Sequence, residues 1–204
     1  AHPACEHEVD RGAVALFLRH NYIPAPYSIY RGIRKLEPGQ IARFTAADAD
    51  PEITRYWSAR DAAEAGLAAP FTGGESEYLE VLARQLEETV RDQMVADVPL
   101  GAFLSGGVDS SLIVALMQRQ SPRPVRTFTI GFHEAEWDEA GHARKVASHL
   151  GTEHTELTLT PQDLLDVVPR LPAMYDEPFS DSSQVPTSLV AALARQHVTV
   201  SLSG

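Results

Sequence analysis

The chain has 204 residues, enough for one or two domains. Hydrophobic residues make up 44% and charged residues 22%, a composition that excludes intrinsic disorder. The net charge is −11 and stays negative even with all 8 histidines protonated. We therefore expect no nucleic-acid partner, because neutralising the phosphates of a nucleic-acid backbone requires clustered Lys and Arg. A single cysteine excludes an internal disulfide and favours a reducing, cytoplasmic location. No apolar run approaches the length of a membrane-spanning helix, so we expect no membrane partner.

The N-terminal third of the chain carries scattered Pro and Arg and differs in character from the rest. Apolar spacing predicts a short helix over 9–20. Two strand-like runs, at 40–45 and 53–57, are predicted to form a hairpin around a loop at 46–52 that is rich in Ala, Asp and Pro. A proline and two adjacent glycines predict a linker over 69–74.

From residue 75 onward helices and strands alternate, so we divide the chain into regions 1–74 and 75–204. Apolar residues spaced three or four apart from Leu79 to Met94 predict a helix, which ends before Pro99. The elements expected after it are strands at 100–104, 125–132, 155–160 and 198–202, and helices at 110–120, 139–150, 161–171 and 186–197. This alternation predicts an α/β fold, in which a parallel sheet is covered by helices on both faces.

The stretch Ser105–Ser111 carries the strongest chemical signal. It reads SGGVDSS and lies between an apolar strand and the start of a helix. Adjacent glycines let the backbone approach an anion, the serines add hydroxyl donors, and the helix start adds N–H groups and the positive end of a dipole. We therefore predict a phosphate-binding loop. It is not the loop of kinases and GTPases, because the pattern G-x-x-x-x-G-K-[ST] is absent.

A carboxylate, Asp109, stands inside this loop and would repel a phosphate unless a cation lay between them. We therefore predict a Mg²⁺ ion held between Asp109 and phosphate oxygens. The alternative is an ordinary strand–turn–helix connection in which Asp109 caps the helix. Two glycines, three serines and one aspartate at a single junction favour the phosphate site.

The loop resembles the pyrophosphate-binding loop (PP-loop) of the N-type ATP pyrophosphatases, which include asparagine, GMP, NAD and argininosuccinate synthetases. Its surroundings resemble the glutamine-dependent asparagine synthetases in order and spacing. The matching segments are DVPLG at 97–101, FTIGF at 128–132, DE at 138–139, VASHLGT at 146–152, YDEPFSDSS at 175–183 and VSLSG at 200–204. The end of the glutaminase domain of these enzymes is resembled by PAP at 24–26, IYRGIRKLEPG at 29–39 and YW at 56–57.

The resemblance implies a ligase of amino-acid biosynthesis with an adenine nucleotide alpha-hydrolase-like fold in 75–204, preceded in 1–74 by part of a glutaminase-type domain. The aspartate side chain would attack the α-phosphorus of ATP, and pyrophosphate would leave. Ammonia, released from glutamine by a cysteine at the mature N-terminus, would then attack the β-aspartyl-adenylate to give asparagine and AMP. The implied partners are small molecules, namely ATP, aspartate and glutamine or ammonia, and a homodimer is left open.

The resemblance also assigns residues by their position in the motifs. It implies that Leu104 and Ile130 contact the adenosine end and that Asp109 is the catalytic and Mg²⁺-binding residue. The implied nucleotide-binding residues are Leu104, Ser105, Gly106, Gly107, Asp109, Ser110, Ile130, Ser203 and Gly204. Independently, Leu104, Ile130 and Ser203 each lie at the carboxyl end of an expected strand, where parallel sheets bind ligands.

Two departures from the family pattern bear on activity. The chain begins with Ala1, and its cysteine, Cys5, lies in a segment like the tail of the glutaminase domain, so Cys5 is not expected to hydrolyse glutamine. The family pattern continues beyond the equivalent of Gly204. We therefore expect the chain to be a fragment that makes no asparagine and binds ATP weakly by itself. The alternatives are a related amidotransferase or β-lactam synthetase-like enzyme that adenylates another carboxylate, and a non-catalytic nucleotide-binding module.

Four further clusters of polar residues were weighed as candidate sites. A metal site at His2, Cys5 and His7 is disfavoured against an ordinary polar tail, and His142 with His149 is interpreted as a pair of surface or packing histidines. Arg31, Arg34 and Lys35 are interpreted as a solvated turn, with a contact to a domain outside this chain as the alternative. Asp176, Glu177 and Asp181 are interpreted either as lining of the substrate pocket or as a loop in which Asp181 or Ser182 caps the next helix.

Overall fold

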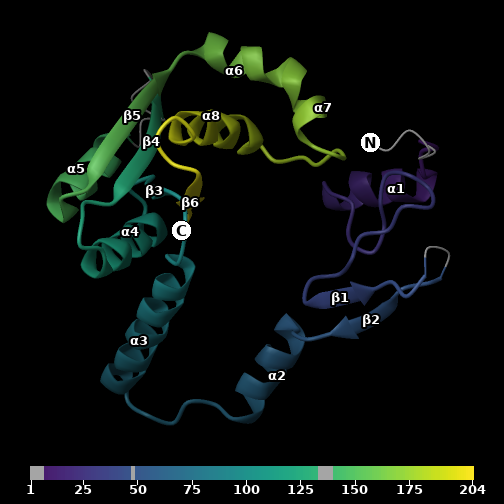
Figure 1. Cartoon of the computed structure of the whole chain (residues 1–204), viewed down its shortest axis with the longest axis horizontal. Coiled ribbons are helices and arrows are strands. Elements are labelled where there is room, and N and C mark those ends of the chain that lie inside the picture. Colours follow the sequence, from purple (N-terminus) through teal and green to yellow (C-terminus); the bar gives the residue numbers. More distant parts are fainter. Residues whose placement is uncertain (1–6, 47–48, 133–139) are drawn as a thin grey trace. The chain divides into compact units, whose positions relative to one another are not determined.

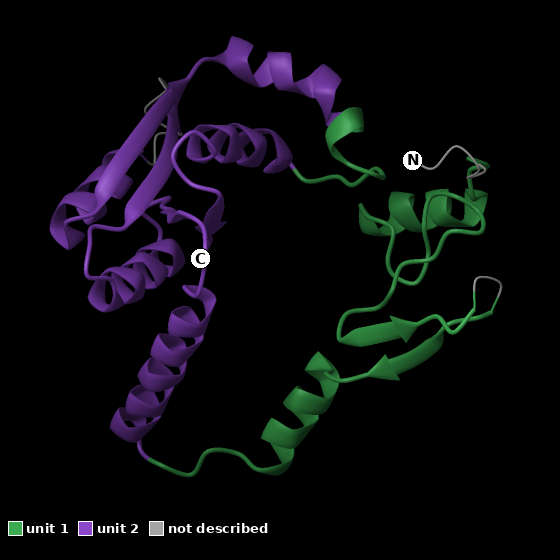
Figure 2. Ribbon diagram, viewed as in Figure 1, with its two compact units in different colours: residues 1–73, 172–181 green, residues 74–171, 182–204 purple. Residues whose placement is uncertain are grey.

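The computed structural model describes residues 7–46, 49–132 and 140–204. It divides into two compact units (Figure 2). Unit 1 comprises residues 1–73 and 172–181, and unit 2 comprises residues 74–171 and 182–204. The sequence predicted a single boundary, between residues 74 and 75. In the structure, residues 172–181 also belong to unit 1, which that boundary did not include. The assignment of domains to these residues stays a prediction.

Unit 1 contains the elements α1 (Arg11–His20), β1 (Gln40–Arg43), β2 (Glu52–Arg55) and α2 (Ala59–Ala68) (Figure 1). Asp10 begins α1 by accepting a hydrogen bond from the backbone N–H of Gly12 at 2.7 Å, and Asn21 ends the helix in the left-handed conformation. The strands β1 and β2 pair antiparallel, as the sequence predicts. The predicted loop between them includes residues 47 and 48, which lie outside the described residues.

The helix α2 was not predicted. It has no buried residue, so no apolar face marks it in the sequence. Its alanines favour the helical state, and the Ser58 side chain caps it by accepting from the backbone N–H of Asp61 at 3.2 Å. Local propensity and capping thus form this helix without a periodic apolar signal.

Unit 2 is built around a four-stranded sheet with the order β5-β4-β3-β6. The strands are β3 (Leu100–Phe103), β4 (Arg126–Phe132), β5 (Glu153–Leu159) and β6 (Val200–Leu202). Every neighbouring pair in it is parallel, which confirms the predicted α/β class. The helices of this unit are α3 (Glu75–Gln93), α4 (Val108–Gln120), α5 (Ala140–Leu150), α6 (Pro161–Val167) and α8 (Gln184–Ala194).

Helices cover both faces of the sheet, as predicted (Figure 1). On one face, residues of α3, α4 and α5 pack with Ala102 and Leu104. On the other face, α8 packs through Val190 and Leu193 against Phe128. Because side chains alternate along a strand, successive residues of β3 and β4 supply both layers of the core.

Two of the expected helices have different limits in the structure. The helix expected over 161–171 ends at Val167 and continues as a 3₁₀ turn, Val168–Arg170, and a short helix, α7 (Leu171–Met174). Pro169 explains the change, because it has no N–H for the α-helical hydrogen bond. The helix expected from 186 begins at Gln184, and its N-cap position is Ser183 rather than Asp181 or Ser182. Glu139, the expected start of another helix, lies outside the described residues.

A polar network joins Thr127, Thr152 and His154 at two neighbouring strands. The hydroxyl of Thr127, which is fully buried, lies 2.9 Å from His154 Nδ1 and 2.9 Å from the hydroxyl of Thr152. Burial lowers the pKa of His154 below its ordinary value of 6.5; Glu156 opposes this shift and Arg144 adds to it. The neutral imidazole is therefore the form that the folded chain favours.

We expect the free energy of unfolding to fall as the pH drops through about 6.5 toward the lowered pKa of His154. Below 6.5 the unfolded state binds a proton that the folded state binds less readily, so protonation favours unfolding. The measurement is urea unfolding at about pH 7.5 and about pH 5.5, for the wild type and for His154→Gln. The variant should lose less stability between these two pH values; an equal loss would contradict the assignment to His154.

Candidate functional site

The expected phosphate loop leaves the sheet at the carboxyl end of β3. Leu104, which is 1% exposed, donates its backbone N–H to the Phe128 carbonyl at 2.9 Å. Its own carbonyl accepts from the hydroxyl of Thr129, a buried residue of β4, at 2.5 Å. The neighbouring strand therefore fixes the point at which the loop begins. The carboxyl edge of a parallel sheet is where such folds place ligands.

The serines of the loop bond to one another. The hydroxyls of Ser105 and Ser110 lie 2.9 Å apart, and the backbone N–H of Ser105 donates to the Ser110 hydroxyl at 3.2 Å. The backbone N–H of Gly107 donates to the Ser105 hydroxyl at 3.2 Å. These bonds stabilise the turn. The hydroxyls of Ser105 and Ser110 therefore have a structural role in addition to any contact with a ligand.

The first turn of α4 follows directly. The sequence predicted this helix from residue 110, but it begins at Val108, so Asp109 and Ser110 lie in its first turn. Gly107 is the N-cap residue and no side chain caps the helix. The first N–H groups of a helix have no partner within it, so these donors can bind an anion. The Asp109 side chain is exposed, and no ion pair or hydrogen bond of its carboxylate is found among the described residues.

Close backbone packing brings two distant segments to the loop. Gly106 has φ +82°, and a Cβ placed on it would lie 2.6 Å from the backbone nitrogen of Ala143 in α5. A Cβ on Gly204 would lie 2.5 Å from the backbone nitrogen of Ser110. The segment Ser203–Gly204, at the carboxyl end of β6, therefore lies against the first turn of α4. The structure brings this segment and the loop together, as the sequence predicts for residues at one sheet edge.

A cavity of about 330 Å³ lies beside the loop and is mostly apolar. Three of the predicted residues, Leu104, Ser105 and Ile130, line it. The sequence analysis missed the other lining residues, which are Phe103, Phe128, Thr129, Phe132, Pro186 and Val190. The aromatic residues could have been found from their place in the strands that end here. Nothing in the sequence pairs α8, which carries Pro186 and Val190, with this edge.

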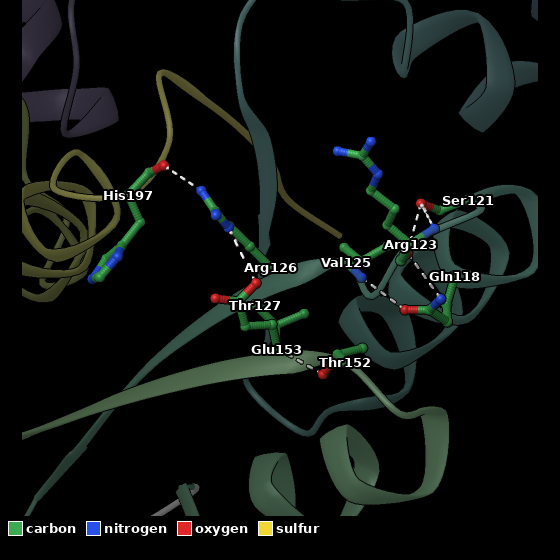
Figure 3. Close-up of polar contacts among 9 residues, drawn as sticks. All are labelled: Gln118, Ser121, Arg123, Val125, Arg126, Thr127, Thr152, Glu153 and His197. Atoms are coloured by element: carbon green, nitrogen blue, oxygen red, sulfur yellow. Dashed lines mark hydrogen bonds and ion pairs between the residues drawn. The ribbon is translucent and has the colours of Figure 1, made fainter.

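A second, larger hollow of about 740 Å³ lies at the opposite edge of the sheet. Leu100, Arg126 and Glu153, the first residues of their strands, line it. Arg126 donates to the Glu153 carboxylate at 3.2 Å and to the carbonyl of His197 at 2.9 Å (Figure 3). The guanidinium therefore already has partners within the chain, and this edge carries none of the predicted loop residues.

Two of the remaining candidate clusters contain histidines. The residues His2 and Cys5 lie outside the described residues, and within residues 7–46, 49–132 and 140–204 no group of three or more His, Cys, Asp or Glu residues is placed to hold a metal ion. The side chains of His142 and His149 are exposed. No helix in the described ranges combines the length and the apolar character that crossing a membrane requires.

The interpretation of the basic cluster of unit 1 needs a correction. The interpretation of a solvated turn fits Arg31, which forms an exposed ion pair with Glu8, but it is wrong for Lys35. Lys35 is partly buried and pairs with Glu177, which also accepts from the backbone N–H of Ile29 at 3.3 Å. Glu177 is thus held by a cation of unit 1, and the lining of a substrate pocket by the acidic cluster stays a prediction.

Comparison with known proteins agrees with the loop and its surroundings. A family model described as asparagine synthase matches residues 81–204, and one described as glutamine amidotransferase domain matches residues 1–57. A Mycobacterium bovis protein provisionally named a glutamine-hydrolysing asparagine synthetase is 39% identical over 199 residues, which cover 97% of this chain and 29% of that protein. The Bacillus subtilis asparagine synthetase (glutamine-hydrolysing) 1 is 30% identical over 198 residues, covering 97% and 30%.

The chain therefore spans about three tenths of the length of these two relatives. Among solved structures, an NH3-dependent NAD synthetase from Campylobacter jejuni aligns with 57% of this chain and 52% of its own, at 12% identity and a TM-score of 0.40. The family model for asparagine synthase covers more than half of the chain, and its range contains the SGGVDSS loop and the whole parallel sheet. On this match, the chain belongs to the asparagine synthase family.

Proposed function

We propose that this chain carries the nucleotide-activating site of a glutamine-dependent asparagine synthetase. ATP would bind at the carboxyl edge of the sheet, the aspartate side chain would become β-aspartyl-AMP, and ammonia would convert it to asparagine, with release of AMP and pyrophosphate. The observation that supports this most directly is the uncapped first turn of α4 in the SGGVDSS loop, next to the apolar cavity. The N-terminal region, which the amidotransferase model matches, would belong to the part that releases ammonia from glutamine.

Each end of ATP would find the chemistry that suits it. The backbone N–H groups of Val108, Asp109 and Ser110, in the first turn of α4, and the positive end of the α4 dipole favour the polyphosphate. The cavity lined by Leu104, Phe128 and Ile130 favours the adenosine end, because it is mostly apolar. Ser203 and Gly204, which lie against the same turn, would close the phosphate side.

The surroundings of Asp109 fit a Mg²⁺ ion bound together with a polyphosphate. Its carboxylate is exposed at the first turn of α4 and has no cationic partner among the described residues. Carboxylate and phosphate oxygens are ligands that Mg²⁺ prefers, and few protein ligands are needed when phosphates supply the others. When bound, the ion would neutralise charge on the phosphates and on the departing pyrophosphate.

This chain's own part in the reaction would be positioning and charge stabilisation. Attack on the α-phosphorus needs the attacking carboxylate oxygen in line with the departing pyrophosphate. A rigid cradle of backbone donors would hold the polyphosphate in the orientation that this requires. The hydrogen bonds between Ser105, Gly107 and Ser110 hold this cradle in shape before the ligand binds. No side chain of the loop is required to form a covalent bond to the substrate.

The proposal is tested in the full-length enzyme, meaning a polypeptide of the relatives' length that contains these residues. With MgATP and aspartate, it should form asparagine with either glutamine or ammonia as the nitrogen source, and one AMP for each asparagine. Asparagine and AMP are measured chromatographically, with glutamate in place of aspartate as the control. AMP formation with another carboxylate but not with aspartate would contradict the proposed acceptor. Absence of AMP with every carboxylate would contradict adenylation itself.

A further inference from the structure

The phosphate loop begins with a peptide group that two hydroxyls hold, and the proposed function assigns no role to one of them. Leu104 follows β3 and donates its backbone N–H to the Phe128 carbonyl at 2.9 Å. The Leu104 carbonyl then accepts from the hydroxyl of Thr129 at 2.5 Å. A side-chain hydroxyl of β4 therefore satisfies the carbonyl from which the loop starts.

One rigid group transmits this bond to the loop. The Leu104 carbonyl and the Ser105 N–H belong to the same planar peptide unit, so fixing one end fixes the other. The Ser105 N–H donates to the Ser110 hydroxyl at 3.2 Å, and the two serine hydroxyls lie 2.9 Å apart. Ser110 lies in the first turn of α4, whose N–H groups would bind the polyphosphate. Thr129 and Ser110 thus hold the peptide unit from its two opposite ends.

Burial makes the Thr129 bond matter for the loop. Leu104 is 1% exposed and Thr129 is 4% exposed, so the surrounding side chains keep water from replacing a lost donor. A buried carbonyl without a donor is costly, and the peptide unit can regain a partner only by rotating. Such a rotation would also turn the Ser105 N–H away from Ser110, because the N–H and the carbonyl point to opposite sides of one plane. We therefore expect loss of the Thr129 hydroxyl to loosen the turn.

The position of Thr129 in its strand separates this effect from the adenosine end of the site. Side chains alternate along a strand, so the Thr129 side chain lies on the face of the sheet opposite to Phe128 and Ile130. Phe128 and Ile130 pack with residues of α8, and both line the apolar cavity. Thr129 also belongs to the cavity wall, but its hydroxyl donates to the Leu104 carbonyl. A change confined to that hydroxyl leaves both apolar side chains in place.

We infer that Thr129 is a positioning residue for the polyphosphate: its hydroxyl holds the peptide between Leu104 and Ser105 and thereby keeps the first turn of α4 ready to bind phosphates. The identity of the nucleotide rests on the proposed function. The connection from Thr129 to Ser110 rests on hydrogen bonds within unit 2 alone. Because Thr129 acts through the loop, it affects the affinity for the phosphate end of a ligand and not the affinity for adenosine.

Calorimetric titration of the full-length enzyme with MgATP, magnesium pyrophosphate and adenosine tests the inference. Thr129→Val keeps the size of the side chain and removes the hydroxyl. It should raise Kd about tenfold for MgATP and for pyrophosphate, and change Kd for adenosine by less than about twofold. Thr129→Ser keeps a hydroxyl and should bind both phosphate ligands within about threefold of the wild type. An unchanged Kd for pyrophosphate in Thr129→Val, or an equal loss for adenosine, would overturn the inference.

The matched control is Thr127→Val in the same strand. Thr127 is fully buried, and its hydroxyl bonds to Thr152 and His154 instead of the loop. Both valine variants lose a buried hydroxyl and should be less stable in urea, but Thr127→Val should keep Kd for the phosphate ligands within about twofold. An equal rise of Kd in the two variants would show a general effect on the sheet and overturn the positioning role. If Thr129→Val does not fold, Thr129→Cys replaces it; its thiol is a weak donor, so Kd for pyrophosphate should still rise about threefold or more.

Hydrogen exchange of the full-length enzyme tests the connection without a ligand. It is measured by mass spectrometry on the peptide that covers residues 105–110. These amides should exchange about tenfold faster in Thr129→Val and at the wild-type rate in Thr127→Val. Unchanged exchange in Thr129→Val would overturn the inference even where Kd rises. If the wild-type enzyme binds pyrophosphate but forms no asparagine, the proposed function fails, and the titration and exchange measurements still decide the role of Thr129.

Discussion

Asp109→Asn is expected to lower ATP–pyrophosphate exchange in the full-length enzyme about a hundredfold or more, a loss near 3 kcal/mol in transition-state stabilisation. The physical reason is the position of the carboxylate. It lies at the first turn of α4 without a cationic partner in the described part of the chain, next to N–H groups that attract phosphates. Asparagine is nearly the same size but carries no charge, so the substitution removes the attraction for Mg²⁺ and leaves the shape of the turn.

The control for this change is Asp61→Asn, which also removes an acid from the first turn of a helix, α2. Both substitutions should lower stability by less than about 1 kcal/mol, because each loses only a favourable interaction with a helix dipole. Only the change at Asp109 should affect exchange. Exchange that stays within about threefold of the wild type in Asp109→Asn would show that the carboxylate has no part in adenylation.

Gly106→Ala is expected to have the largest effect on stability, about 2–4 kcal/mol, together with loss of MgATP binding. The residue has φ +82°, and an added Cβ would meet Ala143 N at 2.6 Å, His142 Cβ at 2.8 Å and His142 C at 2.9 Å. Two of these are backbone atoms of α5, so the helix itself must shift. The loop on which the proposed phosphate site depends would move with it.

Gly151→Ala provides the matched control. Gly151 also has a positive φ, +70°, but a Cβ there meets no atom within 4 Å. In this variant the free energy of unfolding should fall only by the strain of a left-handed alanine, about 1 kcal/mol, and the affinity for MgATP should be unchanged. Urea unfolding measures the loss of stability, and calorimetric titration with MgATP measures the affinity. Equal losses of stability in the two variants would show that the close approach of Gly106 to α5 contributes nothing.

The sequence by itself determined the fold class and the position of the loop. Apolar strands alternate along the chain with segments whose apolar residues are three or four apart. This pattern predicts a parallel sheet, because helices must bury both of its faces, and the structure confirms it. The SGGVDSS stretch predicts a strand–turn–helix unit because glycine and serine favour the turn and the helix start. These signals are local, so one sequence suffices to find them. The roles of Asp109 and of the nucleotide-binding residues remain predictions.

Only the tertiary structure decided the features that join distant parts of the chain. The attachment of Glu177 to Lys35 and Ile29 joins residues more than a hundred positions apart, and no periodicity encodes such a contact. The approach of Gly106 to α5 and the presence of Pro186 in the cavity wall likewise depend on how elements pack. Even the local helix α2 lay outside the apolar pattern, because it buries no side chain. Periodicity reports which faces are buried, whereas the partners of each face are set by packing in three dimensions.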